Sequence, residues 1–106
     1  MNISVKSVHF HADSKLELFV QKKLERLGKL FDRIQDIEVQ LKLQDTGSRV
    51  KEKITEIRMR VPGGWLMDRR TNTTFEAAIT ESVDSLKRQV VKHKEKHYAP
   101  GRSELD

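Results

Sequence analysis

Five cations stand close together near the end of the chain, where they could bind phosphate groups. The segment 87–98 carries Lys87, Arg88, Lys92, Lys94 and Lys96 against a single acidic residue. A helix dipole favours cations in the last turn, typically by about 0.3–1 kcal/mol each, and this accounts for one or two of them. Because five such charges also repel one another, an anionic partner explains the run better than a solvated helix end.

Two histidine pairs have spacings that metal sites use. His93 and His97 are four residues apart, on one side of a helix, whereas His9 and His11 would share one face of a strand. Residue 94 is a lysine, so the HExxH pattern of zinc proteases is absent, and the sequence places no third ligand nearby. We therefore expect no metal. His93 and His97 are interpreted as extending an apolar stripe, and His9 and His11 as strand-end or surface residues.

Catalytic chemistry has little support in the sequence. The chain has no cysteine, which excludes disulfides, thiolate zinc sites and a cysteine nucleophile. A nucleophile elbow, a P-loop and a glycine-rich dinucleotide turn are also missing. The carboxylates fit helix and loop solvation rather than acid–base chemistry. We expect a protein that is not an enzyme and that uses no cofactor and no small-molecule substrate.

Composition favours a small folded domain with an anionic partner. The 106 residues suffice for one hydrophobic core, and 21 Lys and Arg against 16 Asp and Glu give a formal net charge of +5. That balance favours nucleic acid first and a membrane surface second. The N-terminus has no signal-peptide pattern, and no run approaches the roughly 20 apolar residues of a membrane span. We expect a cytoplasmic protein without a membrane partner.

Alternation of polar and apolar residues predicts four strands. The first ends near Phe10, the second covers 37–44, the third holds Ile57, Met59 and Val61 on one face, and the fourth covers 65–71. Turns are expected at 45–48 and 62–64. Ile54 has the wrong parity for the buried face of the third strand, which indicates a bulge or an irregular stretch before it.

Helical spacing predicts two amphipathic helices. The first is capped by Asp13 or Ser14 and runs to about Leu30. The second begins with a Thr73–Glu76 capping box, or with Thr74 as the cap, and runs to roughly residue 98. Their apolar stripes are Leu16, Phe19, Val20, Leu24, Leu27 and Phe31 in the first, and Phe75, Ala78, Ile79, Val83, Leu86 and Val90 in the second.

The order β-α-β-β-β-α predicts an α+β fold. The first helix is a crossover, so the first two strands should be parallel if adjacent, and the hairpins make the other neighbours antiparallel. The expected architecture is a four-stranded mixed sheet with two roughly parallel helices packed on one face. Residues 1–98 would form a single domain, and residues 99–106 a short flexible tail.

Charges on the first helix are sorted by side. Lys15, Lys22, Arg26 and Lys29 cluster along one flank, and the acidic residues Glu17 and Glu25 lie on the other. Lys23 falls within the apolar stripe and must extend its ammonium group outward. On the second helix, Lys87 and Lys94 share one flank, whereas Arg88 and Lys92 share the other. This sorting predicts a shared positive ridge.

The sheet offers a weaker nucleic-acid signal. Trp65 and Tyr98 could stack on bases, and Trp65 could equally cover the sheet edge or the core. Arg58 and Arg60 should point to the open face of the sheet, and Arg69 and Arg70 add positive charge nearby. A charged wet face is ordinary, so the helices carry more of the functional argument.

Several segments resemble the ribosome hibernation-promoting factors, also called ribosome-associated inhibitors or sigma-factor modulation proteins. Residues 75–79 and 83–94 are similar to the last helix of that family, with the runs LKRQ at 86–89 and KHK at 92–94 the most specific part. Residues 23–27 with Phe31 resemble its first helix, and residues 61–64 its third-strand turn. The resemblance covers about residues 2–98. Arg69 and Arg70 stand where the family often has acidic residues, and Thr80 where it usually has Asp.

The resemblance implies a short-form hibernation factor without the second domain of long members. Such a protein would bind small-subunit ribosomal RNA near the decoding and tRNA sites and block translation by occlusion in stationary phase or stress. It would be a monomer when free. By position, the resemblance assigns phosphate contacts to Lys22, Lys23, Arg26, Lys29, Lys87, Arg88, Lys92, Lys94 and Lys96.

Two other functions stay open from the sequence. A modulator that binds a protein such as a sigma factor would use the sheet face or the hairpin rather than the helix lysines. A generic double-stranded RNA binder also packs two helices on an antiparallel sheet, but that module begins with a helix, unlike this chain.

Overall fold

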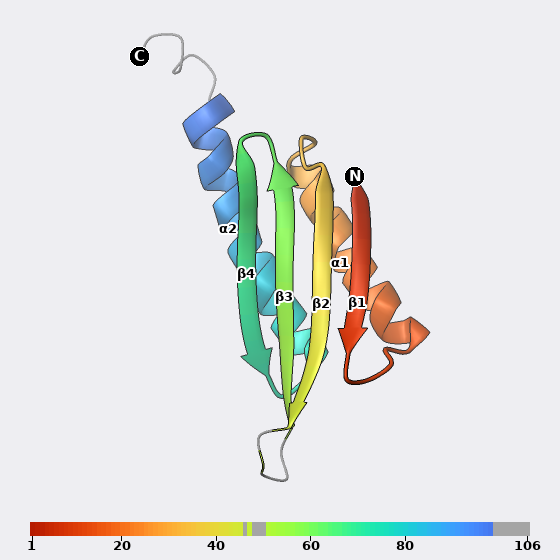
Figure 1. Ribbon diagram of the computed structural model, residues 1–106. Coiled ribbons are helices and arrows are strands. Elements are labelled where there is room, and N and C mark those ends of the chain that lie inside the picture. Colours follow the sequence, from red (N-terminus) through yellow and green to blue (C-terminus); the bar gives the residue numbers. More distant parts are fainter. Residues whose placement is uncertain (46, 48–50, 99–106) are drawn as a thin grey trace.

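The predicted element order is confirmed. The computed structural model describes residues 1–45, 47 and 51–98 and contains β1 (Asn2–Val8), α1 (Ser14–Leu30), β2 (Asp36–Asp45), β3 (Lys51–Val61), β4 (Gly64–Asn72) and α2 (Phe75–Tyr98) (Figure 1). The first strand ends at Val8 rather than near Phe10, because His9 adopts φ +68°, which leaves the extended conformation. The tail predicted at 99–106 lies outside the described residues.

The sheet has the predicted mixed topology. Its strand order is β1-β2-β3-β4, with β1 and β2 parallel and the other two pairs antiparallel. A parallel pair needs a crossover connection, and α1 supplies it. Both helices lie behind the sheet in Figure 1 and run in roughly the same direction, so one face of the sheet is covered and the other is open. The α+β class and the two-layer architecture are therefore confirmed.

The bulge considered for the third strand is absent. The register of β3 is continuous from Lys51 to Arg60 against β2 and from Lys53 to Val61 against β4. Ile54 therefore points to the open face, as its parity requires, yet only 1% of it is exposed. It lies between its cross-strand partners Lys42 and Thr71. Ile54 is therefore buried by its neighbours within the sheet, although it does not face the helices.

The core lies between the helices and the covered sheet face. The whole predicted stripe of α2 is buried, whereas Leu16 and Phe19 of α1 are half-buried at its margin. Burying one Leu, Ile or Val side chain stabilises a fold by about 1.5–3 kcal/mol. Among the described residues, neither helix is long and apolar enough to cross a membrane. The fully buried side chains include Val20, Leu24, Leu27, Ile37, Val39, Leu41, Ile57, Met59, Ile79, Leu86 and Val90.

Side-chain caps start both helices. Asp13 caps α1, because its Oδ1 accepts the Leu16 N–H at 2.8 Å. Thr74 caps α2, because its Oγ1 accepts the Ala77 N–H at 3.1 Å. The alternative Thr73–Glu76 capping box is therefore wrong, since Glu76 is one position too early in the helix to serve it.

Glycine conformations mark the two turns. Gly63 has φ +93° in the two-residue connection between Val61 and Gly64, which pair across the hairpin. Of the turn predicted at 45–48, Thr46 and Ser48 lie outside the described residues. Gly47 has φ +82° and donates its N–H to Asp45 Oδ1 at 2.9 Å, a local bond typical of such turns.

The same substitution should have different effects on stability at two glycines. Gly63→Ala is expected to lower the free energy of unfolding by about 1–2 kcal/mol, because an L-residue is strained at positive φ. Gly28→Ala lies inside α1, where its Cβ would meet the flexible end of Met1 at 2.8 Å. It should leave stability unchanged or raise it by up to about 1 kcal/mol, because alanine favours a helix. Urea unfolding of both variants tests this, and equal effects would contradict the turn assignment.

Candidate nucleic-acid interface

The cations of α1 lie on its solvent side and on the flank toward α2. Gly28 approaches the Met1 side chain, and Met1, Glu25, Gly28 and Lys29 line a shallow hollow, so the flank of α1 that carries Glu25 faces the β1 edge. The opposite flank, which carries Lys23 and Arg26, is therefore turned toward α2. Lys22, Arg26 and Lys29 are exposed. The separation of basic and acidic sides that the sequence predicts is therefore incomplete on this helix, because Lys29 lines the same hollow as Glu25.

Lys23 extends along the helix surface as predicted. It is half-buried, and its Nζ lies 5.6 Å from the centroid of the Phe19 ring, one turn earlier. The ammonium group therefore contacts an aromatic face while its stem covers apolar surface.

One contact joins the cationic flanks of the two helices. Lys94 Nζ donates a hydrogen bond to the carbonyl oxygen of Leu30, the last residue of α1, at 3.1 Å. Since Lys87 lies two turns before Lys94, both side chains share the side of α2 that faces α1. The seam between the helices is thus lined by Lys23 and Arg26 from one helix and by Lys87 and Lys94 from the other.

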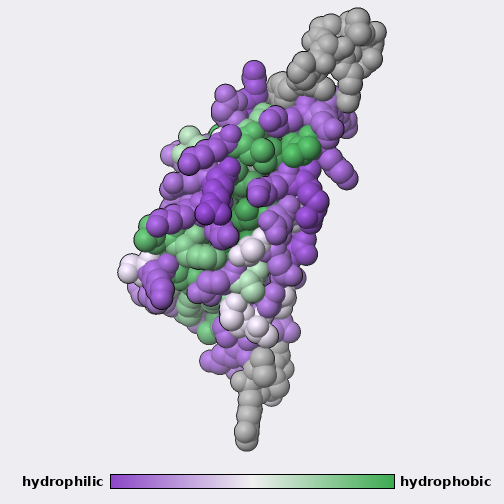
Figure 2. Space-filling view, turned by 180° about the vertical axis from the view of Figure 1, so that it is seen from behind, coloured by the Kyte–Doolittle hydropathy of each residue, from purple (hydrophilic) through white to green (hydrophobic). Residues whose placement is uncertain are grey.

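Not every predicted cation belongs to this seam. Arg88 and Lys92 are exposed on the outward side of α2. Lys96 lies seven residues after Gln89, whose side chain bonds to β4, so Lys96 is on the flank away from α1. Figure 2 views the helix side and shows hydrophilic side chains over most of it, with a hydrophobic strip between them. We call this surface the helix face, with its nine predicted cations Lys22, Lys23, Arg26, Lys29, Lys87, Arg88, Lys92, Lys94 and Lys96.

The helix-face cations are not neutralised within the described part of the chain. None of the nine forms an ion pair with a carboxylate among residues 1–45, 47 and 51–98. Lys94 uses one of its three N–H donors on Leu30, and the remaining charge stays on the surface. The seam is therefore a concentration of uncompensated positive charge, the arrangement that attracts phosphate.

The open sheet face behaves differently. Lys42 Nζ lies 2.8 Å from Glu56, an Arg58 nitrogen 3.5 Å from Glu38, and Arg69 Nε 3.8 Å from Glu56. Arg60 pairs with Asp36 in the same way. We call these four contacts the ion-pair ladder. The arginines point to the open face as predicted, but their charges are compensated there.

Trp65 belongs to this open face, not to the core. It is 39% exposed, and the guanidinium carbon of Arg58 lies 4.5 Å from its ring centroid, with that of Arg60 at 6.0 Å. Covering the core is therefore excluded for Trp65, whereas covering the sheet edge is not, because β4 is an edge strand. The Tyr98 side chain, also considered for stacking, lies outside the described part of the structure.

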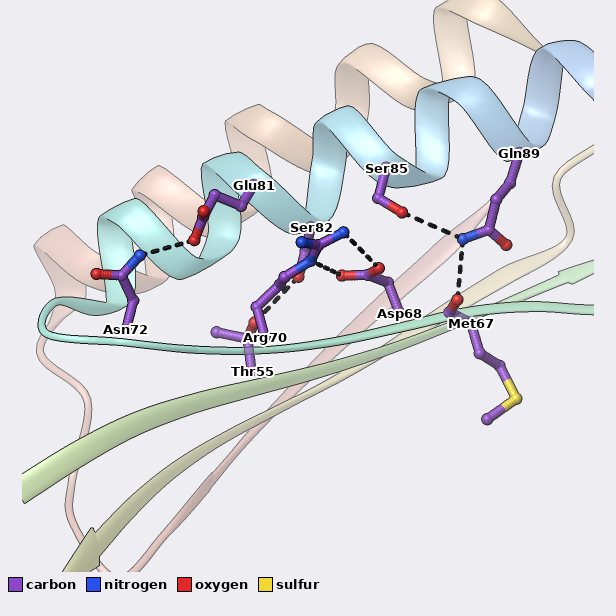
Figure 3. Close-up of polar contacts among 9 residues, drawn as sticks. All are labelled: Thr55, Met67, Asp68, Arg70, Asn72, Glu81, Ser82, Ser85 and Gln89. Carbon is purple, nitrogen blue, oxygen red and sulfur yellow. Dashed lines mark hydrogen bonds and ion pairs between the residues drawn. The ribbon is translucent and has the colours of Figure 1, made fainter.

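A polar cluster fixes how α2 is rotated on the sheet (Figure 3). The buried hydroxyl groups of Thr55 and Ser82 lie 3.1 Å apart, and Gln89 Nε2 donates to the Met67 carbonyl of β4 at 3.0 Å. Asn72 Nδ2 also donates to Glu81 Oε1 at 2.7 Å. These contacts tie α2 to β3 and β4, and those of Gln89 and Glu81 lie on its β4 side, so the opposite flank, with Lys87 and Lys94, is turned toward α1.

Asp68 is the charged centre of this cluster. Its side chain is 9% exposed and pairs with Arg70 at 3.0 Å. Burial raises the pKa of the carboxyl group, but hydrogen bonds from Arg70, Ser82 and Ser85 outweigh that effect. The net result is a pKa below the ordinary value of 3.8. Arg70, which the sequence placed among the extra positive charges, is thereby neutralised.

The histidines do not assemble a metal site among the described residues, in which no group of three or more His, Asp or Glu is suitably placed. His93 is half-buried with its ring edge-on to Phe31 at 5.7 Å, as expected where an apolar stripe continues, and the His97 ring lies 4.5 Å away. Burial lowers the pKa of His93, and the nearby His97 and Lys96 add to that effect.

His9 and His11 are exposed, as one interpretation predicted, but the assignment to a shared strand face is wrong. Both follow the end of β1 at Val8 and lie in the loop that leads to α1.

Sequence reasoning missed the roles of Lys94, Thr55 and Ser82. Lys94 and Leu30 are 64 residues apart, and the flank of Lys94 was assigned to phosphate binding alone. Ser82 interrupts the apolar stripe of α2, which was the one available signal that a polar contact is buried there. Its hydrogen-bonding partner, Thr55, can be identified only from the structure, because this requires knowing which residue of β3 lies beneath Ser82.

Comparison with known proteins is consistent with this geometry. A family model described as sigma 54 modulation protein / S30EA ribosomal protein matches residues 3–98. A ribosome hibernation promoting factor of Pseudomonas putida is 30% identical over 96 residues, covering 91% of this chain and 89% of that protein. One of Azotobacter vinelandii is 31% identical over 96 residues, covering 91% and 85%.

Two solved structures share the fold. The N-terminal domain of Thermus thermophilus Protein Y has a TM-score of 0.70 and 28% identity, covering 88% of this chain and 99% of that one. A ribosomal subunit interface protein from Coxiella burnetii has a TM-score of 0.77 at 19% identity, covering 89% and 98%, a likeness of fold alone.

Removal of the Lys94 ammonium should loosen the packing between the helices. Lys94→Met keeps the apolar stem and is expected to lower the free energy of unfolding by about 1–2 kcal/mol, the scale of a hydrogen bond to a charged group. The matched variant Lys87→Met, two turns earlier, should change it by less than about 0.5 kcal/mol. Urea unfolding measures both values, and equal losses would show that Lys94 does not bridge the helices.

Asp68 should make the fold sensitive to acid. Because its pKa is lower in the folded chain than the ordinary 3.8, its contribution is fully present above that value and is lost as the pH falls through the folded-state pKa. Asp68→Asn should lower stability at neutral pH and flatten the loss in acid. Urea unfolding from neutral pH to below pH 3.8 tests this for both proteins, and parallel pH profiles would contradict it.

Proposed function

The chain belongs to the sigma 54 modulation protein / S30EA ribosomal protein family, and we propose that it is a hibernation factor that binds ribosomes and inhibits translation. The family match and the relatives named ribosome hibernation promoting factor support this role. We further propose that it binds small-subunit ribosomal RNA near the decoding and tRNA sites, in the cytoplasm, during stationary phase or stress. The free protein is proposed to be a monomer.

One observation supports RNA as the partner of the helix face. Cations from two helices converge on one seam without carboxylate partners in the described residues, whereas the four cations of the ion-pair ladder on the opposite face are paired. Helix dipoles do not account for Lys22, Lys23 or Lys87, because the dipole acts within the last turn and these residues lie earlier. Phosphates at the seam would compensate the charge and release counterions, a favourable contribution at low salt.

The fold supplies shape as well as charge. Phosphate contacts position a protein on nucleic acid but do not by themselves select a sequence. The two helices are held side by side by a buried core and by the Lys94–Leu30 bond, so the cations keep a defined spacing. A rigid pattern of this kind selects a surface by the arrangement of its phosphates, which folded ribosomal RNA provides. The proposed inhibition is steric: the bound domain occupies space that messenger and transfer RNAs need.

A protein-binding role remains the second candidate, as the words "sigma 54 modulation" in the family description suggest. The observation in its favour is that Trp65 and Met67 are exposed side by side on the charge-compensated face, at 39% and 58%. Tryptophan, methionine and arginine are enriched in protein interfaces. Binding through this face would survive high salt and would not require the helix cations.

Ribosome binding should depend on the helix cations and not on net charge alone. The variant Lys22→Ala, Arg26→Ala, Lys87→Ala and Arg88→Ala spares Lys94, which supports the fold. We expect it to co-sediment poorly with small subunits. The slope of log affinity against log salt should fall by about 0.7–0.9 for each phosphate that the variant no longer binds.

The matched control removes four cations from the ladder: Lys42→Ala, Arg58→Ala, Arg60→Ala and Arg69→Ala. The two variants have the same net charge, and they lose it from opposite sides of the sheet. The control should keep near-native binding. If both variants bind alike, or if the helix variant binds normally, the proposed interface is wrong.

A further inference from the structure

The ion-pair ladder is set by the register of three strands. The aligned rows are Asp36–Arg60–Trp65, Glu38–Arg58–Met67 and Gln40–Glu56–Arg69, drawn from β2, β3 and β4 in that order. Each row places a carboxylate directly beside a guanidinium group. Lys42 joins from one row further along, on the same face, and also pairs with Glu56.

Stability does not explain the ladder. The Arg58–Glu38 side chains are 50% and 51% exposed and Arg69 is 60% exposed, whereas Asp36 and Glu56 are partly exposed at 29% and 35%. Ion pairs between exposed side chains contribute about 0–1 kcal/mol each. Amides have the same shape as these acids and can still accept hydrogen bonds, so we expect the conversion to leave the fold intact. What the acids do change strongly is the electrostatic potential of the face.

The charge balance of the ladder is close to neutral. Lys42, Arg58, Arg60 and Arg69 face three carboxylates, which leaves one net positive charge on the ladder. Without those carboxylates the same surface would present four cations around Trp65 and Met67. Such a patch would match the four cations of the seam in number and would add an aromatic ring on which bases stack.

We propose that Asp36, Glu38 and Glu56 are specificity-determining residues, which confine RNA to the helix face by cancelling the charge of the opposite face. This inference rests on the proposed function. Phosphate attraction is independent of sequence, so a chain that is basic on both sides would bind RNA in two orientations and bridge separate RNA molecules. The three carboxylates remove the second orientation and leave one productive way to dock.

The chain carries its own reporter for this face. Trp65 is the sole tryptophan of the sequence, and it lies against Arg58 and Arg60 of the ladder. RNA that docks on the open face must approach the indole ring or displace a guanidinium group from it. Tryptophan emission therefore separates open-face binding from helix-face binding, which occurs on the other side of the sheet.

The test compares two variants of equal net charge with the unaltered chain. The ladder variant is Asp36→Asn, Glu38→Gln and Glu56→Gln. The control variant is Glu17→Gln, Glu25→Gln and Asp84→Asn, all exposed positions on the two helices. Each protein is titrated with a short RNA duplex and with a single-stranded oligonucleotide at several salt concentrations. Tryptophan emission, stoichiometry and salt dependence are recorded, and urea unfolding verifies that each variant is folded.

The ladder variant alone should show a change in Trp65 emission and more than one RNA bound per protein. Its salt slope should steepen by up to about 0.9 for each additional phosphate bound on a duplex. The control should bind more tightly than the unaltered chain without a change in emission. The proposal is overturned if the ladder variant matches the control, or if RNA already changes the emission of the unaltered chain.

Failure of the proposed function would look different. An unaltered chain that does not bind ribosomes would contradict the hibernation role, whatever the variants do. The comparison of the ladder variant with its control can still be interpreted in that case, because it measures on which face RNA binds after charge is added. It does not depend on ribosome binding.

Discussion

The packing of α1 against α2 decides where the charges of both helices lie. Each helix buries one apolar stripe, and burial of these stripes against the same sheet face forces the helices side by side. Their basic flanks then meet at a seam, although lysines placed near one another repel. The buried core supplies the free energy that holds this arrangement, and the Lys94–Leu30 bond ties the end of α1 to α2. Positive charge is thus concentrated at the expense of some stability.

The rotation of α2 matters as much as its position. If α2 were rotated by a quarter turn about its axis, Lys87 and Lys94 would no longer point into the seam. The contact of Ser82 with Thr55 in β3 and the bond from Gln89 to Met67 in β4 prevent such a turn, because both would break. A buried polar pair specifies orientation better than apolar packing does, since a hydroxyl group without its partner in the core is costly.

Much of the architecture was predictable because it follows from local patterns. Periods of two and of about 3.6 identify the strands and helices, and the crossover rule with short hairpins gives the strand order. The sorting of charges on each helix could also be predicted from the sequence, because the position of a residue around a single helix follows from its number. Pairwise features were not predictable. The pairing of Glu38 with Arg58 depends on the register of β2 and β3, and the bond from Lys94 to Leu30 depends on the packing of two helices. The alternation of residues along β3 gives the face of Ile54 but does not predict that a residue on the open face is buried.

A density map of the protein bound to the small ribosomal subunit tests the central claim most directly, because it shows which surface meets RNA. We expect α1 and α2 to lie against ribosomal RNA, with phosphates within bonding distance of the seam cations Lys23, Arg26 and Lys87, and the ion-pair ladder to face away from RNA. A map in which the open sheet face rests on RNA while the seam is exposed to solvent would contradict this claim.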